Sequence, residues 1–307
     1  MRLVLLASVL SVSCVASASF ELVLALDTGN HMIHRVDGER SIYLGNFGAN
    51  RLLYPTGMAV QQSTNRVHVF DANLHAFISF DYNTGEKVAE AVAPSFGYAQ
   101  FGLANNGDFL IGDFASTTAR RYSQSGALLA TFTAPAGAAG TRAMTQAADG
   151  NYYVAWSGIN AITRHNSAGA LLATVVGTNA ALSDCRQMFV QNNQVVISGG
   201  SSGRWMRANY SGSTAWGSIT EMTSMAFAYG VSGGHFSTIY SGGYVGTGNC
   251  VLNSFNLSTG GQMSAYTIPG AGNVTALGTV VAPEPHTVVG MLMAGGLGLL
   301  SRRKRRG

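Results

Sequence analysis

The sequence predicts an all-β protein, a six-bladed β-propeller closed by a C-terminal strand. Three observations lead to this prediction. The chain repeats with a period near 43 residues, each repeat holds several short strands joined by glycine turns, and no long stretch has the 3.6-residue periodicity of a helix. A right-handed β-solenoid is the structural alternative, and it fits less well because solenoid repeats are usually shorter.

The repeat is marked by one position, at the end of a buried strand. The equivalent residues in the six units are Asp27, Asp71, Asp113, Trp156, Gly199 and Ser241. Their spacings lie between 42 and 44 residues. In each unit a polar turn precedes this strand, and a third strand such as 161–164 follows it. A glycine turn then opens a fourth strand such as 127–132.

The two ends of the repeat array predict how the ring closes. Residues 21–26 already correspond to a second strand, so the first unit lacks a first strand. An extra strand over 273–280 follows the last unit. We expect this strand to complete the first blade, because closure removes an open sheet edge that would otherwise pair with other chains.

The chain divides into three predicted segments: a signal peptide at 1–18, the propeller at 19–281 and a tail at 282–307. The first segment has a cation at Arg2, an apolar run over 3–15 and the small residues Ala16-Ser17-Ala18, so we expect cleavage after Ala18. A first buried strand or helix, or a lipoprotein acylated at Cys14, are the alternatives.

The tail has three parts in a fixed order. A stiff break, Pro283-Glu284-Pro285, precedes an apolar stretch over 288–300. The chain then ends in the basic cluster Arg302, Arg303, Lys304, Arg305 and Arg306. Thirteen helical residues cover only about 20 Å of a hydrocarbon core of about 30 Å. A short transmembrane helix is nevertheless expected, with flanking residues included and its basic end cytoplasmic.

This tail closely resembles the PEP-CTERM sorting signal of Gram-negative bacteria, over residues 282–307. The resemblance implies recognition by an exosortase, a membrane cysteine protease that would cut near Pro283-Glu284-Pro285. The exported domain would then pass from an inner-membrane-anchored precursor to the cell surface or the extracellular matrix. Proteins with this signal are similar in their link to exopolysaccharide-producing bacteria. Without processing, the same tail would be a simple membrane anchor.

The first repeat resembles the NHL repeat through Asp27-Thr28-Gly29-Asn30-His31 and the following Ile33, Val36 and Asp37. The match extends over residues 22–135, is fainter in the second unit, and departs from the family at Met32, where a basic residue is usual. It implies a six-bladed propeller. Because NHL-like propellers include binding scaffolds and some enzymes, the fold does not define the function.

The distribution of charged residues argues against nucleic acid as a partner. The formal net charge is +4, but the termini supply it. The segment 19–281 holds 12 basic and 13 acidic residues, and Lys87 is its single lysine. Nucleic-acid binding needs clustered basic side chains on a folded face, so we do not expect it.

Two groups of polar residues could bind ligands. Asp27, Asp71 and Asp113 share one phase of successive blades and could line a rim that binds a cation or sugar hydroxyls, or each could cap a turn. Four arginines follow the marker position by eight residues: Arg35, Arg121, Arg164 and Arg207. They could bind an anionic glycan, or they could pair with aspartates or carbonyl groups between blades.

No motif indicates a metal, a cofactor or a catalytic group. The sequence has no HExxH, paired CxxC or phosphate-loop pattern. We expect no GxSxG nucleophile elbow, because glycine-rich runs such as 198–203 are more typical of turns between strands. Cys185 and Cys250 could form one disulfide in an exported protein, or they could be two buried thiols. Tryptophans such as Trp156 and Trp205 could stack on sugars or fill the space between blades.

These observations favour an exported, non-enzymatic propeller that binds an envelope protein or an extracellular polysaccharide, or acts as a surface structural element. A secreted hydrolase or lyase with its site in the propeller tunnel is the alternative. An enzyme predicts several carboxylate or histidine side chains together at the tunnel mouth. A scaffold predicts a tunnel lined by glycine, alanine, serine and threonine.

Overall fold

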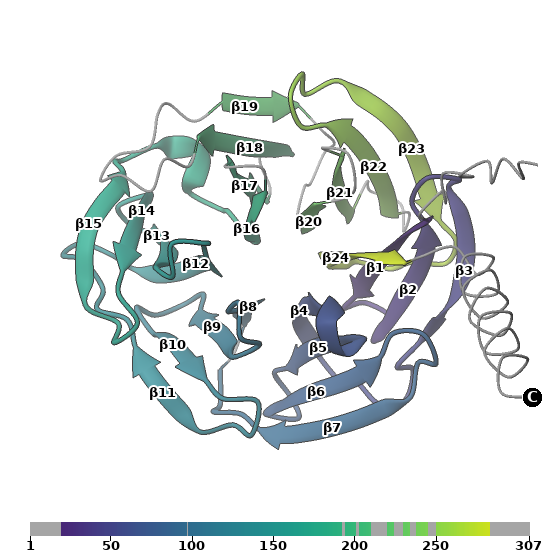
Figure 1. Ribbon diagram of the computed structural model, residues 1–307, viewed down its shortest axis with the longest axis horizontal. Coiled ribbons are helices and arrows are strands. Elements are labelled where there is room, and N and C mark those ends of the chain that lie inside the picture. Colours follow the sequence, from purple (N-terminus) through teal and green to yellow (C-terminus); the bar gives the residue numbers. More distant parts are fainter. Residues whose placement is uncertain are drawn as a thin grey trace, which may run out of the picture. The chain divides into compact units, whose positions relative to one another are not determined.

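Four-stranded antiparallel sheets form the architecture of the part of the chain that the structure describes. This computed structural model describes residues 20–282, apart from 97, 192–193, 201–202, 210–219, 224–229, 234–237 and 245–249. Within these residues there are six sheets, arranged around a common centre as the blades of a propeller (Figure 1). The predicted six-bladed, all-β fold is confirmed, and the unit spans residues 21–281.

Blades 1 to 3 are formed by the first half of the propeller together with its last strand. Blade 1 contains β24 (Val274–Ala282), β1 (Phe20–Asp27), β2 (Met32–Asp37) and β3 (Ile42–Phe47), in that order. Blade 2 contains β4 (Pro55–Gln61), β5 (Arg66–Asp71), β6 (Ala76–Asp81) and β7 (Lys87–Val92). Blade 3 contains β8 (Ala99–Leu103), β9 (Phe109–Asp113), β10 (Ala119–Tyr122) and β11 (Leu128–Thr131).

Blades 4 to 6 continue the ring in chain order. Blade 4 contains β12 (Gly140–Gln146), β13 (Tyr152–Ser157), β14 (Ala161–His165) and β15 (Leu171–Val176). Blade 5 contains β16 (Met188–Gln191), β17 (Gln194–Ser198), β18 (Arg204–Asn209) and β19 (Thr220–Thr223). Blade 6 contains β20 (Gly230–Gly233), β21 (Thr238–Tyr244), β22 (Cys250–Asn256) and β23 (Gln262–Ile268). The described helices are two short 3-10 turns, η1 (Gln62–Thr64) and η2 (Ala180–Leu182).

Burial changes with distance from the centre of the ring. The first strand of each blade lies innermost, and the fourth lies at the outer edge (Figure 1). Every residue of β13 is buried, whereas β7 is almost wholly exposed. Blades pack face to face, so a middle strand buries both of its faces and reads as a continuous apolar run.

The hydrophobic core lies in the wedges between neighbouring blades. Between blades 2 and 3, for example, Phe77 packs against the rings of Phe70, Phe109 and Tyr122, with 4.6 Å between the ring centres of Phe77 and Phe109. Similar clusters join blades 3 and 4, 4 and 5, 5 and 6, and 6 and 1. Large rings suit these places because adjacent blades diverge from the axis and leave more volume to fill.

The ring closes as the sequence predicts. Strand β24 is hydrogen-bonded to β1 and takes the innermost position of blade 1. The first and last strands of the propeller therefore share one sheet, and blade 1 has the same four-stranded order as the other blades. Closure of this kind covers the inner edge of β1, which would otherwise be open.

The predicted signal peptide, 1–18, and the apolar stretch predicted to span a membrane, 288–300, lie outside the described residues. Of the helices that can be examined in the described part of the chain, none is long and apolar enough to cross a membrane. Those two predictions therefore remain predictions.

Candidate binding site at the channel and its mouth

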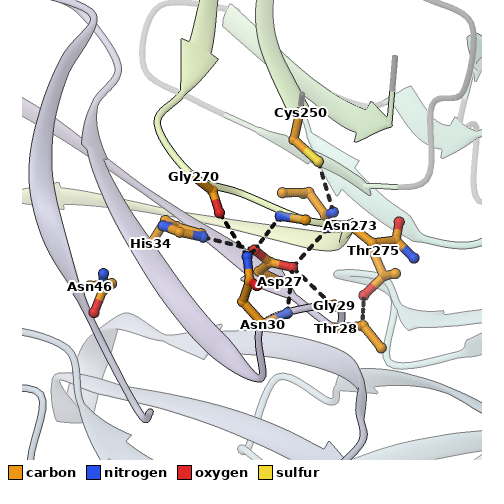
Figure 2. A network of polar contacts seen from close by, with 12 residues as sticks. Asp27, Thr28, Gly29, Asn30, His34, Asn46, Cys250, Gly270, Asn273 and Thr275 are labelled. Carbon is orange, nitrogen blue, oxygen red and sulfur yellow. Dashed lines mark hydrogen bonds and ion pairs between the residues drawn. The ribbon is translucent and has the colours of Figure 1, made fainter. Parts of the chain in front are cut away.

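Asp27 fastens the closing strand. Its side chain caps the turn after β1, accepting hydrogen bonds from the backbone N–H groups of Gly29 at 2.9 Å and Asn30 at 3.1 Å. It also accepts from the N–H groups of Gly272 at 2.7 Å and Asn273 at 2.8 Å, directly before β24 (Figure 2). One buried carboxylate thus binds the first and the last parts of the ring together.

Neighbouring groups complete this network, which we call the closure clamp. His34 Nε2 lies 3.0 Å from Asp27 Oδ2, and the Asn30 amide donates to the same oxygen at 2.8 Å. The Sγ atom of Cys250 accepts from the N–H of Val274 at 3.3 Å. Burial alone would raise the pKa of Asp27, but the hydrogen bonds from His34, Asn273 and other donors outweigh it and hold this pKa well below its ordinary value.

The other two aspartates of the predicted rim also bind backbone. Asp71 caps the turn after β5 through the N–H groups of Asn73 and Leu74. It also binds the N–H of Leu53 at 2.7 Å, just before the inner strand of its own blade. Asp113 accepts from the N–H of Ala115 and the hydroxyl of Ser116. Asp27 and Asp71 are fully buried, so the structure gives them a capping role and no access to a rim ligand.

The predicted arginines tie neighbouring blades. Arg35 in blade 1 donates to the carbonyl of Asn83 in blade 2 at 2.9 Å. Arg121 in blade 3 donates to the hydroxyl of Tyr152 in blade 4 at 2.5 Å, with its guanidinium over that ring. Arg207 in blade 5 donates to the carbonyl of Leu257, which follows β22 of blade 6.

Arg164 occupies β14 of blade 4, opposite Tyr153 of β13. Arg35, Arg121 and Arg207 therefore follow the inter-blade interpretation rather than forming one anion site. These ties repeat every second blade, and each reaches forward to the next blade in chain order.

The cysteines and histidines form no site. Cys185 and Cys250 are both free and buried, in the separate clusters of blades 4–5 and 6–1. The disulfide interpretation is therefore wrong, because the two thiols lie in different wedges of the ring. No group of three metal-binding side chains occurs in the described residues. Trp156 and Trp205 are buried between blades and are not available to stack on a sugar.

A channel of about 350 Å³ runs between the inner strands. All six of them line it: β4, β8, β12, β16, β20 and β24. Its polar side chains are neutral: Thr145, Gln187, Gln191, Ser232 and Thr279. Among the described lining residues there is no acidic, basic, histidine or cysteine side chain. This volume is in the range of small-molecule sites, and its described walls offer hydroxyl and amide groups but no carboxylate or imidazole that could act as a general acid or base.

Gln187 ties one side of the channel where the inner strands begin. Its amide oxygen accepts from the N–H groups of Val231 at 3.0 Å and Leu277 at 3.1 Å. Its amide nitrogen donates to the carbonyl of Leu277 at 2.7 Å. One side chain of blade 5 therefore binds the inner strands of blades 6 and 1.

Blades 3, 4 and 5 place a different group at this end, which we call the mouth cluster. It consists of Tyr98, Phe114, Arg142, Asp184 and Arg186. Sequence reasoning missed these residues because it compared the repeats only at the marker position and at the arginines eight residues after it. A signal is present in the sequence: Tyr98, Arg142 and Arg186 follow one another at intervals of 44 residues, within the period of the repeat. Each stands one to three residues before a residue that lines the channel.

Comparisons with known proteins define the fold and leave the function open. No protein-family model and no curated protein matches the chain. The class that the fold defines is the six-bladed propeller, and solved structures of this kind are similar to it. A protein of unknown function from Bacteroides caccae has a TM-score of 0.64 and 13% identity, covering 86% of this chain and 99% of that chain.

Two further structures extend the comparison. A chain from a nidogen/laminin complex has a TM-score of 0.65 and 14% identity, with 86% of this chain and 99% of that chain covered. The hydrazine synthase of Kuenenia stuttgartiensis has a TM-score of 0.52 and 10% identity, with 74% and 71% covered. At these identities the similarity shows the fold alone.

Proposed function

We propose that this protein is an exported, non-enzymatic β-propeller that binds a ligand or partner at the cell surface or in the extracellular matrix. The observation that carries the non-enzymatic part is the channel, whose described lining has no ionisable side chain. A propeller enzyme needs groups that transfer protons or hold a metal, and those groups usually meet in such a cavity.

The two chain ends support export and sorting. The segment 1–18 has the pattern of a signal peptide, and 282–307 has the order of the PEP-CTERM signal. We propose that an exosortase-like protease cuts near Pro283-Glu284-Pro285, after the precursor has been anchored in the inner membrane. Strand β24 ends at Ala282, so a cut at this point removes no strand from any blade.

Partners of two kinds are consistent with this proposal, an envelope protein or an extracellular polysaccharide. One similar chain comes from a nidogen/laminin complex, so a propeller of this kind occurs in a complex between proteins. The neutral hydroxyl and amide side chains of the channel are suited to sugar hydroxyl groups.

The first experiment is the intact mass of the protein from its native cells, measured separately in the membrane and medium fractions. We expect a chain that lacks residues 1–18 and ends near Pro283-Glu284-Pro285. A chain that keeps Arg302–Arg306 and stays in the membrane would refute processing and leave a tail-anchored propeller.

The alternative is a secreted hydrolase or lyase, and it is tested on the same purified protein. Reducing ends released from neutral and acidic polysaccharides would be measured over hours. We expect no turnover. Steady release of product, retained through further purification, would refute the non-enzymatic proposal.

A further inference from the structure

The mouth cluster sits directly beside the channel. Tyr98 precedes β8, Arg142 is near the start of β12, and Arg186 precedes β16. These are the inner strands of three successive blades, and the neighbouring pairs contact each other. Phe114 follows β9 and belongs to the same end of blade 3, because its N–H donates to the carbonyl of Tyr98.

Two arginines converge on one aromatic ring. The guanidinium carbon of Arg142 lies 3.4 Å from the ring centre of Phe114, and that of Arg186 lies 4.2 Å from the same centre. Tyr98 meets Phe114 edge-on, with 5.7 Å between ring centres, and Arg186 also faces Tyr98 at 5.4 Å. Stacking on rings holds guanidinium groups in place while leaving their edges available for hydrogen bonds.

The cluster carries excess positive charge. Asp184 pairs with Arg186 at 2.8 Å, so two guanidinium groups face one carboxylate. The Nε and Nη1 atoms of Arg142 are buried and have no hydrogen-bond partner in the described structure. Burial lowers the pKa of Arg142, Asp184 acts in the opposite direction, and Arg186 adds to the lowering. An arginine stays charged despite such a shift, so among the described residues of the cluster two guanidinium groups share the one carboxylate of Asp184.

A second unpartnered donor lies at the same level. Gln100 is 6% exposed, and its Nε2 atom is buried without a hydrogen-bond partner. Gln100 pairs with Gly112, and a side chain at Gly112 would collide with Thr141, the neighbour of Arg142. Single unpartnered nitrogens also occur on Arg35, Arg121 and other described arginines, but Arg142 has two of them. With Gln100, three unpartnered donors lie on two neighbouring inner strands, and this concentration favours an acceptor supplied by another molecule.

We propose that the mouth cluster binds the carboxylate group of a small acidic sugar. The carboxylate pairs with Arg142 and Arg186, and the sugar ring lies against the half-buried Tyr98 with its hydroxyl groups toward the channel. This inference rests on the proposed binding function and specifies its ligand class.

The charge of the cluster selects the anion. Two guanidinium groups and one carboxylate leave one net positive charge, which matches a single carboxylate group of the ligand at the cluster. A phosphate dianion would bring a second negative charge close to Asp184 and is disfavoured. The neutral polar side chains of the channel suit sugar hydroxyl groups better than the charged or extended backbone groups of an acidic peptide.

The test is calorimetric titration of the full-length chain with digalacturonate, using the neutral disaccharide lactose and a tetraglutamate peptide as comparisons. We expect binding of digalacturonate alone. Arg186→Gln and Arg142→Gln should each weaken it by about tenfold or more, because charge-assisted hydrogen bonds are lost. Arg40→Gln is the matched control, since Arg40 is half exposed on a different turn, and it should change affinity less than about twofold.

Folding and specificity are checked in the same series. Circular dichroism confirms that each variant is folded, and Arg186→Lys, which keeps the charge, should retain part of the affinity. Equal binding of wild type and both glutamine variants would show that the cluster only holds blades together. Binding of tetraglutamate in preference to digalacturonate would overturn the sugar assignment.

The two proposals can fail separately. If digalacturonate does not bind but the native protein has the expected truncated mass, the acidic-sugar proposal fails and the proposal of an exported propeller stands. If digalacturonate binds as expected but the native protein keeps its tail, the ligand proposal stands and the processing proposal fails.

Discussion

The closure clamp and the mouth cluster are both built from charged groups at turns next to inner strands, yet their hydrogen bonding differs. In the clamp, the buried Asp27 carboxylate receives backbone and side-chain hydrogen bonds on both oxygens. In the cluster, Arg142 keeps two buried nitrogens without an acceptor. The clamp connects the two ends of the ring, whereas the cluster lies where three inner strands begin, next in sequence to residues that line the channel.

This difference separates a structural role from a binding role. A buried polar network with all its partners stabilises one arrangement of the chain. A buried cation without a counterion costs free energy unless another molecule supplies the missing charge. The clamp should therefore dominate stability, and the cluster should matter little to stability and much to binding.

Asp27→Ala should have the largest effect. It leaves several N–H donors of the first and last strands without an acceptor, so we expect a loss of about 3–5 kcal/mol in the free energy of unfolding. Urea unfolding followed by circular dichroism measures it. Asp81→Ala is the matched control, because Asp81 caps an exposed turn through Asn83 and Thr84, and should cost about 1 kcal/mol. Equal losses would contradict the closing role of Asp27.

The buried His68 should give the next largest effect, through pH. Burial, aided by Arg66, lowers its pKa to about 4 from 6.5, and it is hydrogen-bonded to Ser79 and Gln61. The unfolded state therefore binds more protons between these pH values, so stability falls as the pH is lowered from 6.5 to 4. The loss is about 3 kcal/mol at about 1.4 kcal/mol per pH unit.

The pH dependence of the unfolding midpoint checks this expectation. His68→Asn should flatten the curve between pH 6.5 and 4. His165 keeps a smaller dependence of the same sign, because burial lowers its pKa too. His75→Asn is the control, since His75 is exposed in a turn with a φ of 49°, which asparagine tolerates. If His68→Asn leaves the pH dependence of the unfolding midpoint unchanged, that dependence arises from other titratable groups.

The buried thiols should be protected from modification. Burial raises the pKa of Cys185 to about 12 and also raises the pKa of Cys250. Both should resist iodoacetamide at pH 8 in the folded protein and react in urea, as read by peptide mass mapping. Asp27→Ala should expose Cys250, which supports β24, before Cys185. A disulfide-linked peptide pair from the native protein would contradict the structure.

Arg186→Gln should have the smallest effect on stability. Its ion pair with Asp184 is partly exposed, and such pairs contribute up to about 1 kcal/mol. Thermal unfolding in the absence of ligand should therefore shift by only a few degrees. A loss as large as that of Asp27→Ala would make the mouth cluster a second clamp and remove the contrast between the two regions.

The fold could be predicted because the same pattern of strands and turns recurs along the sequence. The spacing of Asp27, Asp71 and Asp113 follows from a turn that each blade needs, and the asparagine- and glycine-rich turns follow from left-handed backbone angles. The closing strand could also be predicted, because the first unit lacked one strand and the last unit had one too many.

The candidate site could not be predicted in the same way. Arg35 and Arg121 recur at one repeat position, and the structure shows that they tie neighbouring blades. Tyr98, Arg142 and Arg186 also share a repeat position, at intervals of 44 residues. That spacing does not show that the two arginines meet on one phenylalanine ring, because their meeting depends on how three blades pack.

The sequence by itself determined the strand repeat, the six blades and the closing strand, because periodic burial and turn chemistry act over a few residues. It also predicts a sorting signal at each end. Only the tertiary structure decided which polar groups have hydrogen-bond partners, that Cys185 and Cys250 lie in different wedges, and that Arg142 and Arg186 meet on one ring. Those properties depend on contacts between segments that are distant in the sequence, and these contacts form only when the blades pack around the ring.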